Sequence, residues 1–476
     1  MSPFRKILTL SAGDFLAKGL YFLAFIYLAH KLGVASYGAL EFAISLRTYL
    51  LMLADGGLEM WSIREASKST DIRGLVARLV PFRLMLAVAG FSLLMGLLWI
   101  IPDNPNLHRI LPAFGLTVIA QSVSLKWAFM GQQLMSKVAV GLMCSQFVFA
   151  MGVFALVRTP EDIVWVPLSW LVGELVIVGY FWRSFIRSHG RPVFSVHPRG
   201  IISALRPAFT MGAAHAVSLI NYTFDSVLIG IMLGPGSLGW YAAAYKPVTA
   251  ALTIPASYFM GLFPTLSRSY AENRSRFHSL IGRSLRLTAL VSLPFGVTAS
   301  ILAAPLIDFL FGPNYLPGVP ALQLLAWSVV LVTLRGNFRQ GLIAAGKQRL
   351  DLLCAVIAVS ANIVFNLILV PLYGIAGAAV ATLCSELLWL FLSAILFSKY
   401  VGPLTSLTAL LRPCGAAAFM GICMVVSEPL YWMVRGALGG LVYIAILGLL
   451  REPELMARLP LRKPPAVPAA PTSATP

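Results

Sequence analysis

Seven basic residues fall inside stretches that are otherwise apolar enough to cross a membrane. They are Lys18, Arg47, Lys126, Lys246, Arg335, Arg339 and Arg435. A cation near the bilayer centre costs roughly 2.5–3.5 kcal/mol on insertion scales, so such residues normally face a water-filled cavity or a partner. We interpret four of these cations as lining a cavity and binding an anion. The four are Arg47, Lys246, Arg335 and Arg339.

The spacing of two of these residues favours a shared anion site. Arg335 and Arg339 are four positions apart, so they lie on one face of a helix. Asn337 and Gln340 flank them and extend the polar stripe. Lys246 follows Tyr245 and precedes a proline, which predicts a kink with the cation among aromatic groups.

The other three cations have alternative interpretations. Lys18 comes four residues after Asp14, a spacing that also suits an internal structural pair. Lys126 remains a candidate cavity cation, with an acid on a neighbouring helix as the alternative partner. Arg435 lies near a helix end, where snorkelling to the membrane surface is the favoured interpretation.

Acidic and amide residues inside the spans suggest a site for a coupling ion. Asp225 lies four residues after Asn221 on one helix face, with His215 earlier, and Asn362 and Asn366 form a similar pair. Such groups bind Na⁺ or carry a proton, although hydrogen bonding between helices is the favoured reading for any single one. We select Asp225, Asn221 and Glu386 as coupling-ion candidates and expect no other metal and no cofactor.

The composition determines what kind of element positions these residues. The chain has 476 residues, of which 58% are hydrophobic and 11% charged, against about 25% charged in an ordinary soluble domain. A membrane helix needs roughly 20 apolar residues, which leaves room for about 14 spans. The sequence therefore predicts an all-α polytopic membrane protein. Its five cysteines lack the spacing of a metal site or a disulfide framework.

A repeated motif predicts two similar halves. Leu32-Gly33-x-x-Ser36-x-Gly38 recurs 201 residues later as Leu233-Gly234-x-x-Ser237-x-Gly239, each time between two apolar runs. The glycines indicate a tight turn between membrane helices. We predict lobes of six helices at 1–206 and 207–400, two further helices at 401–451, and a disordered tail at 452–476.

The distribution of basic residues predicts the orientation. Lysines and arginines gather on alternate connections, whereas the opposite side has only Lys31, Arg109 and Arg158. The positive-inside rule then places both termini in the cytoplasm. This asymmetry explains most of the net charge of +18, so we expect contact with anionic lipids rather than nucleic acid.

Several motifs in order resemble the Wzx-type polysaccharide flippases of the multidrug/oligosaccharidyl-lipid/polysaccharide exporter superfamily. The matching stretches are the first repeat, Asp55-Gly56-Gly57-Leu58 before Arg64-Glu65-Ala66, Phe311-Gly312-Pro313-Asn314-Tyr315, Gly341-Leu342-x-Ala344-Ala345-Gly346-Lys347, and Pro371-Leu372-Tyr373-Gly374. The resemblance implies two lobes around a central cavity, alternating access, and an undecaprenyl-pyrophosphate-linked oligosaccharide carried from the inner to the outer leaflet of the bacterial inner membrane. It also implies cavity cations at positions matching Lys18, Arg47 and Lys246, with lysine where arginine is frequent at the first and third.

Other functions remain open at this stage. A multidrug antiporter of the same superfamily would use the acids to couple Na⁺ or H⁺, although a cavity with surplus positive charge repels cationic drugs. Lipid II is a further possible cargo, and a polysaccharide polymerase is a possible partner. We discount an enzyme, since every predicted external connection is short.

Overall fold

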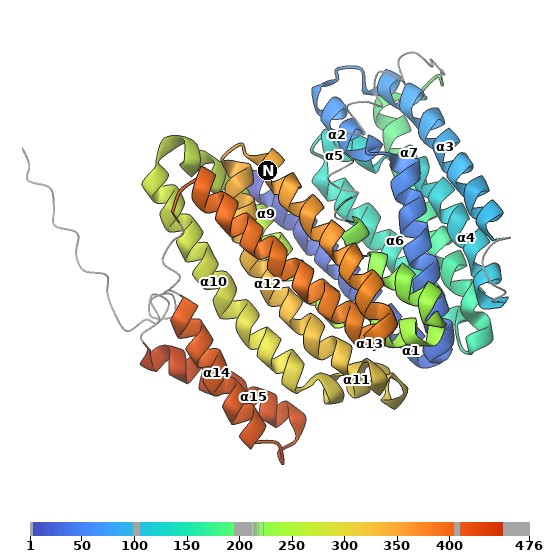
Figure 1. Cartoon of the computed structure of the whole chain (residues 1–476). Helices are drawn as coiled ribbons and strands as arrows, with labels where there is room; N and C mark the ends of the chain where they lie inside the picture. The colour runs from blue at the N-terminus through green and yellow to red at the C-terminus, as the bar shows by residue number, and fades with distance from the viewer. Residues whose placement is uncertain are drawn as a thin grey trace, which may run out of the picture.

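The structure, a computed structural model, describes residues 3–98, 105–194, 223–403 and 410–450, together with 212, 217 and 219–221. Side chains are described from Leu16 onward, except that of Leu97. Apart from short turns, the described chain is helical throughout (Figure 1). The prediction of an all-α membrane protein is confirmed.

The first half contains seven helices and one short 3₁₀ turn. They are α1 (Pro3–Asp55), α2 (Leu58–Lys68), α3 (Ile72–Leu97), α4 (Pro105–Ser122), α5 (Lys126–Gly131), α6 (Met135–Leu156), η1 (Pro160–Val164) and α7 (Trp165–His189).

The first continuous helical stretch described in the second half is Thr223–Met232. There follow α9 (Gly234–Glu272), α10 (Arg274–Ile301), α11 (Ala303–Phe311), η2 (Pro313–Gly318), α12 (Val319–Ala344), α13 (Gln348–Tyr400), α14 (Leu411–Val426) and α15 (Trp432–Leu449).

Single glycines divide the longest helices. Within the described residues, nine helical stretches are long and apolar enough to cross a membrane. Two of these, α1 and α13, have 53 residues each and are broken at Gly33 (φ 72°) and Gly374 (φ 61°), so each supplies two of the predicted spans. Gly234, the counterpart of Gly33 in the repeat, has φ 82°. The predicted turns therefore exist, but each needs only one left-handed residue because glycine reaches that conformation without strain.

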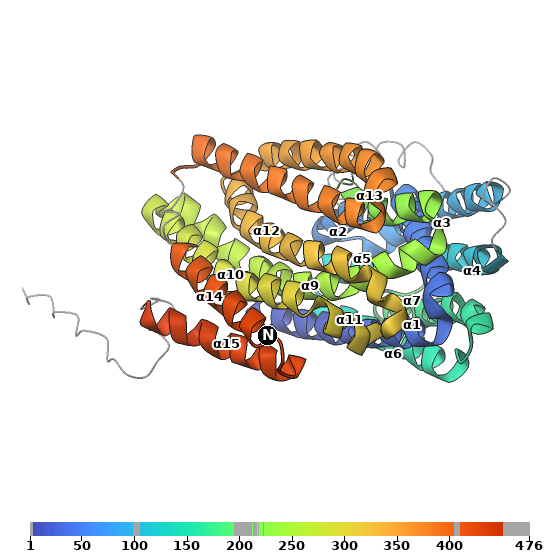
Figure 2. The same ribbon diagram turned by 60° about the horizontal axis from the view of Figure 1, so that its bottom comes forward.

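The two halves converge at the end of the molecule where α1 bends, and α2 and α5 lie at the other end (Figure 1). The largest buried apolar cluster joins the halves, since it contains residues of α1, α4 and α6 together with residues of α9 and α12. Figure 2 shows α14 and α15 on the outside of the second half, where they pack against α10 and α12 in a cluster of their own.

The segment after the first long helix is a tight turn. Gly56 and Gly57 both have positive φ, and the Asp55 carboxylate accepts a hydrogen bond from the Glu59 backbone N–H at 3.1 Å. The chain then enters α2, a separate helix that the sequence analysis had not distinguished. His215 and the tail 452–476 lie outside the described residues, so the predictions for them are not tested.

Candidate functional site

Carboxylates lie beside five of the cations that the sequence singled out for an anion site. The ion pairs are Arg47–Glu174 (3.6 Å), Lys126–Glu59 (2.9 Å), Lys246–Glu41 (2.7 Å), Arg335–Glu386 (3.0 Å) and Arg339–Asp351 (3.2 Å). The expectation of a surplus of positive charge is therefore wrong for these five residues in this structure. The physical reason is that an ion inside a membrane protein is stabilised most readily by an opposite charge from a neighbouring helix.

The other two intramembrane cations are Lys18 and Arg435. Lys18 is exposed on α1, and Asp14, its predicted partner, belongs to the residues whose side chains are not described. Arg435 donates from Nε to the backbone carbonyl of Met424 near the end of α14. Arg435 thus supports a helix terminus, where a cation interacts favourably with the helix dipole.

Arg47 is held within the first half. It is 6% exposed, donates to Thr117 Oγ1 and to Gln121 Oε1 (3.0 Å), and lies 4.7 Å from the centre of a Trp170 ring. Three of its neighbours thus fix the guanidinium in addition to Glu174. Gln121 also lines the cavity described below, so Arg47 is one hydrogen bond away from it.

Arg335 and Arg339 lie on one face of α12, but each is paired with its own carboxylate. Arg335 is 4% exposed, pairs with Glu386 and lies 3.6 Å from the centre of a Trp389 ring. Arg339 pairs instead with Asp351 at the start of α13. Asn337, predicted to lie between them on the stripe, hydrogen-bonds to Ser284 and Thr288 of α10. Arg335 and Arg339 therefore both face α13, as their four-residue spacing predicts, but each meets its own carboxylate. Asn337, two positions after Arg335, faces α10 instead.

The coupling-ion candidates belong to two adjoining buried groups. The Asp225 carboxylate accepts hydrogen bonds from Tyr241 (2.9 Å), Thr382 (2.7 Å) and Asn366 (2.8 Å). The Oδ1 atom of Asn366 is buried and has no hydrogen-bond partner among the described residues. A carboxylate beside an unused amide oxygen is the type of oxygen-rich site that binds a hard cation.

The second group contains the other two candidates. Asn221 donates to Glu386 Oε1 at 3.2 Å, while the other oxygen of Glu386 faces Arg335. Tyr241 and Thr382 were missed by sequence reasoning, since nothing in their local sequence distinguishes them from ordinary helix residues.

A cavity of about 870 Å³ lies between the two halves. The first half contributes Asp55, Glu59, Arg83, Gln121 and Lys126, and the second contributes residues that include Val217, Ser257 and Met260. Two ion pairs face it, Lys126–Glu59 and Arg83–Asp55 (3.2 Å). Arg83, a residue of α3, is only 6% exposed. The wall is otherwise mainly apolar and contains Met52, Met60, Met130 and Met260.

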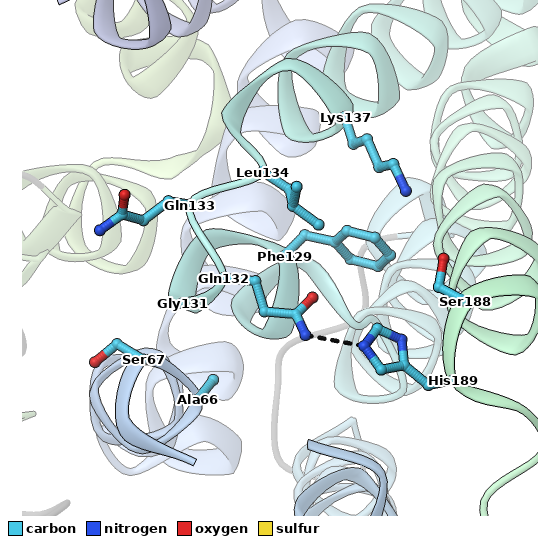
Figure 3. Close-up of a pocket in the computed structure, with 10 residues that line it drawn as sticks. All are labelled: Ala66, Ser67, Phe129, Gly131, Gln132, Gln133, Leu134, Lys137, Ser188 and His189. Carbon is cyan, nitrogen blue, oxygen red and sulfur yellow. Dashed lines mark hydrogen bonds between the residues drawn. The ribbon is translucent and has the colours of Figure 1, made fainter. Parts of the chain in front are cut away.

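A second pocket, of about 660 Å³, lies wholly in the first half and is drawn in Figure 3. Its side chains come from α2, α5, α6 and α7 and from the turn between α5 and α6. It contains a hydrogen bond between Gln132 Nε2 and His189 Nε2 at 3.1 Å. Lys137 at its edge donates to Ser184 Oγ at 2.9 Å. Because the second half contributes nothing to it, this pocket is not part of a passage between the halves.

Comparison with known proteins identifies the family of the chain. The profile of the family described as "Polysaccharide biosynthesis protein" matches residues 4–270, more than half of the sequence. The chain belongs to this family. The resemblance to Wzx-type flippases drawn from the sequence motifs is thereby confirmed. A protein of Escherichia coli K12 named as an O-antigen transporter is 20% identical over 77% of this chain and 89% of its own length.

Solved structures of low sequence identity share the fold. The lipid II flippase MurJ, in an inward closed conformation, superposes with a TM-score of 0.78 at 15% identity, covering 94% of this chain and all of MurJ. A multidrug resistance transporter of the MATE family, in an inward-facing conformation, gives a TM-score of 0.65 at 13% identity, over 80% of this chain and 95% of the transporter. These similarities show the fold and leave the cargo open.

Proposed function

We propose that the chain is a flippase that moves an undecaprenyl-pyrophosphate-linked oligosaccharide from the cytoplasmic to the outer leaflet of the bacterial inner membrane. Transport of glycan precursors, rather than catalysis, agrees with the family and with the names of its relatives. The observation that carries the proposal is the cavity of about 870 Å³ between the halves, with two ion pairs in a mainly apolar wall.

Ion pairs suit a carrier that must also return empty. A lone cation in an unloaded cavity would be costly, and the carboxylates of Glu59 and Asp55 offset this cost until the substrate arrives. A diphosphate then binds Lys126 and Arg83 in place of the carboxylates, since charge-assisted hydrogen bonds to phosphate are strong. The isoprenoid tail remains in lipid throughout. The membrane potential contributes about 2.3 kcal/mol per 100 mV for each negative charge moved outward.

The alternative of a Na⁺- or H⁺-coupled small-molecule exporter is favoured by one observation. Pairing of the cations removes the electrostatic argument against cationic cargo, and the Asp225 group offers a site for the coupling ion. A lipid II cargo is a third candidate, because MurJ shares the fold. A polymerase partner and cytoplasmic termini remain predictions of the sequence.

Reconstitution discriminates among these functions. The purified chain is placed in liposomes with a fluorescent undecaprenyl-pyrophosphate oligosaccharide, with lipid II or with a cationic dye, and movement between leaflets or into the lumen is followed. The proposal predicts fast exchange of the oligosaccharide lipid between leaflets. Transport of the dye alone would contradict it.

Replacement of Asp225 with asparagine is expected to abolish stimulation by an ion gradient. Removing the negative charge removes the electrostatic attraction for a bound cation, while the hydroxyl groups of Tyr241 and Thr382 can reorient to keep the fold. The measurement is the initial flipping rate with and without a Na⁺ or proton gradient. Thr382→Ser, which keeps the hydroxyl, should retain the stimulation. Undiminished stimulation in Asp225→Asn would exclude this group from coupling.

A further inference from the structure

The repeated turns occupy equivalent places in the two halves. Gly33 and Gly234 both adopt positive φ, 72° and 82°. Each breaks the helical path at the same point of the motif, between the first and second helices of its half. The bend of α1 lies at the end of the molecule where the halves converge (Figure 1).

The two copies also touch each other reciprocally. A Cβ atom added at Gly38 would lie 1.7 Å from the carbonyl oxygen of Pro235, and one added at Gly239 would lie 2.2 Å from the carbonyl oxygen of Val34. Both glycines and both carbonyl residues are separated by 201 positions, the period of the repeat. The two approaches are therefore the same contact seen from each half, as in an isologous interface about a two-fold axis.

Further contacts between the two halves surround this backbone contact between the two turns. Tyr315 donates to the carbonyl oxygen of Ala29 at 2.9 Å, and His30 Nε2 lies 3.0 Å from the carbonyl oxygen of Leu310. The rings of Tyr37 and Tyr315 meet edge to face. These bonds hold the halves together at a distance from the cavity, whose lining residues in α1 begin only at Thr48.

An ion pair lies between the contact of the two turns and the cavity. Lys246 of α9 and Glu41 of α1 are 2.7 Å apart, and both side chains are 13% exposed. The ammonium group of Lys246 is also 3.9 Å from the centre of the Phe25 ring. Breaking a pair this poorly hydrated is unfavourable unless another anion replaces the carboxylate.

We propose that the paired turns form the gate that closes the passage on the side opposite the cavity, and that Lys246–Glu41 is its latch. The glycines permit backbones of the two halves to meet, so the gate closes by main-chain contact. The latch opens when the phosphate groups of the cargo replace Glu41 beside Lys246, a step that rests on the proposed function. From the loop charges, this gate faces the outside of the cell.

The test uses a reporter cysteine just inside the gate. Ser45, one turn beyond Glu41 on α1, is 6% exposed, and Ser45→Cys is a small change. In a background with the five native cysteines replaced, the rate of labelling by a membrane-impermeant maleimide is measured in spheroplasts. Gly239→Ala places a methyl group between the two turns and so separates them, and Glu41→Gln removes the ion pair of the latch. Each should raise this labelling rate at least tenfold.

A matched control lies within the same motif. A Cβ at Gly236 would have no described atom within 4 Å, so Gly236→Ala should label as slowly as the parent. Equal rates in Gly239→Ala and Gly236→Ala, with no increase in Glu41→Gln, would overturn the gate. The undecaprenyl-pyrophosphate oligosaccharide is then added to the parent. Faster labelling of the parent in the presence of this lipid supports a latch that the substrate opens. If Gly239→Ala raises the labelling rate but the lipid does not change the rate of the parent, the gate is retained and the proposed cargo is rejected.

Discussion

Lys126→Ala is expected to lower the initial rate of flipping of a diphosphate-linked oligosaccharide at least tenfold, and Glu59→Gln is expected to leave this rate unchanged or raise it. Both substitutions break the same ion pair, Lys126–Glu59, whose side chains are about one-third exposed to the cavity. If the lysine binds phosphate, its loss removes a charge-assisted contact worth about 1.4 kcal/mol for each factor of ten, whereas loss of the glutamate removes only a competitor.

The opposite responses separate binding from structure. Were the pair purely structural, the two variants would lose activity together, and equal losses would therefore refute the role of Lys126. Lys137→Ala is a matched control, since this lysine lies on α6 at the pocket confined to the first half and also bonds to a neighbouring helix. It should retain the rate of the parent. Flipping in proteoliposomes provides the measurement.

Arg335→Ala is expected to produce the largest loss of stability, about 3–5 kcal/mol. Arg335 is 4% exposed and Glu386 is 2% exposed, so removing the arginine leaves an unpaired carboxylate in the interior of the second half. The contact with the Trp389 ring is lost as well. The measurement is unfolding of the purified chain in detergent, followed by heat or denaturant.

A double variant distinguishes loss of pairing from loss of packing. Arg335→Met combined with Glu386→Gln replaces both charges with neutral side chains of similar size, and Asn221 can still donate to the amide oxygen at position 386. We expect it to recover most of the stability lost in Arg335→Ala, because well-packed neutral replacements of a buried pair are frequently tolerated. A double variant as unstable as Arg335→Ala would show that the guanidinium itself is required.

The pairing changes how cargo recognition is understood in this chain. From the sequence, the basic residues were expected to give the cavity a surplus of positive charge. In the structure, five of them lie beside acidic residues. Recognition of a diphosphate then depends on exchange of one anion for another at the same cation. Such exchange costs less than exposing a bare charge, so the cavity can accept the headgroup and later release it.

The sequence by itself determined the apolar spans and the repeated turns at Gly33 and Gly234. Each of these depends on residues adjacent in the chain: enough apolar side chains to cross a bilayer, or a glycine where φ is positive. Local patterns therefore predicted the architecture and its two halves.

Only the tertiary structure decided which charges meet. Arg47 and Glu174 lie on α1 and α7, and Lys246 and Glu41 lie on different halves. Asp225 meets Thr382, which lies 157 positions later within the same half. A single sequence carries several intramembrane acids and bases of equal chemical suitability, and nothing in their spacing selects one combination. Helix packing makes that selection, because only side chains brought within a few ångströms gain enough from pairing to offset their loss of hydration.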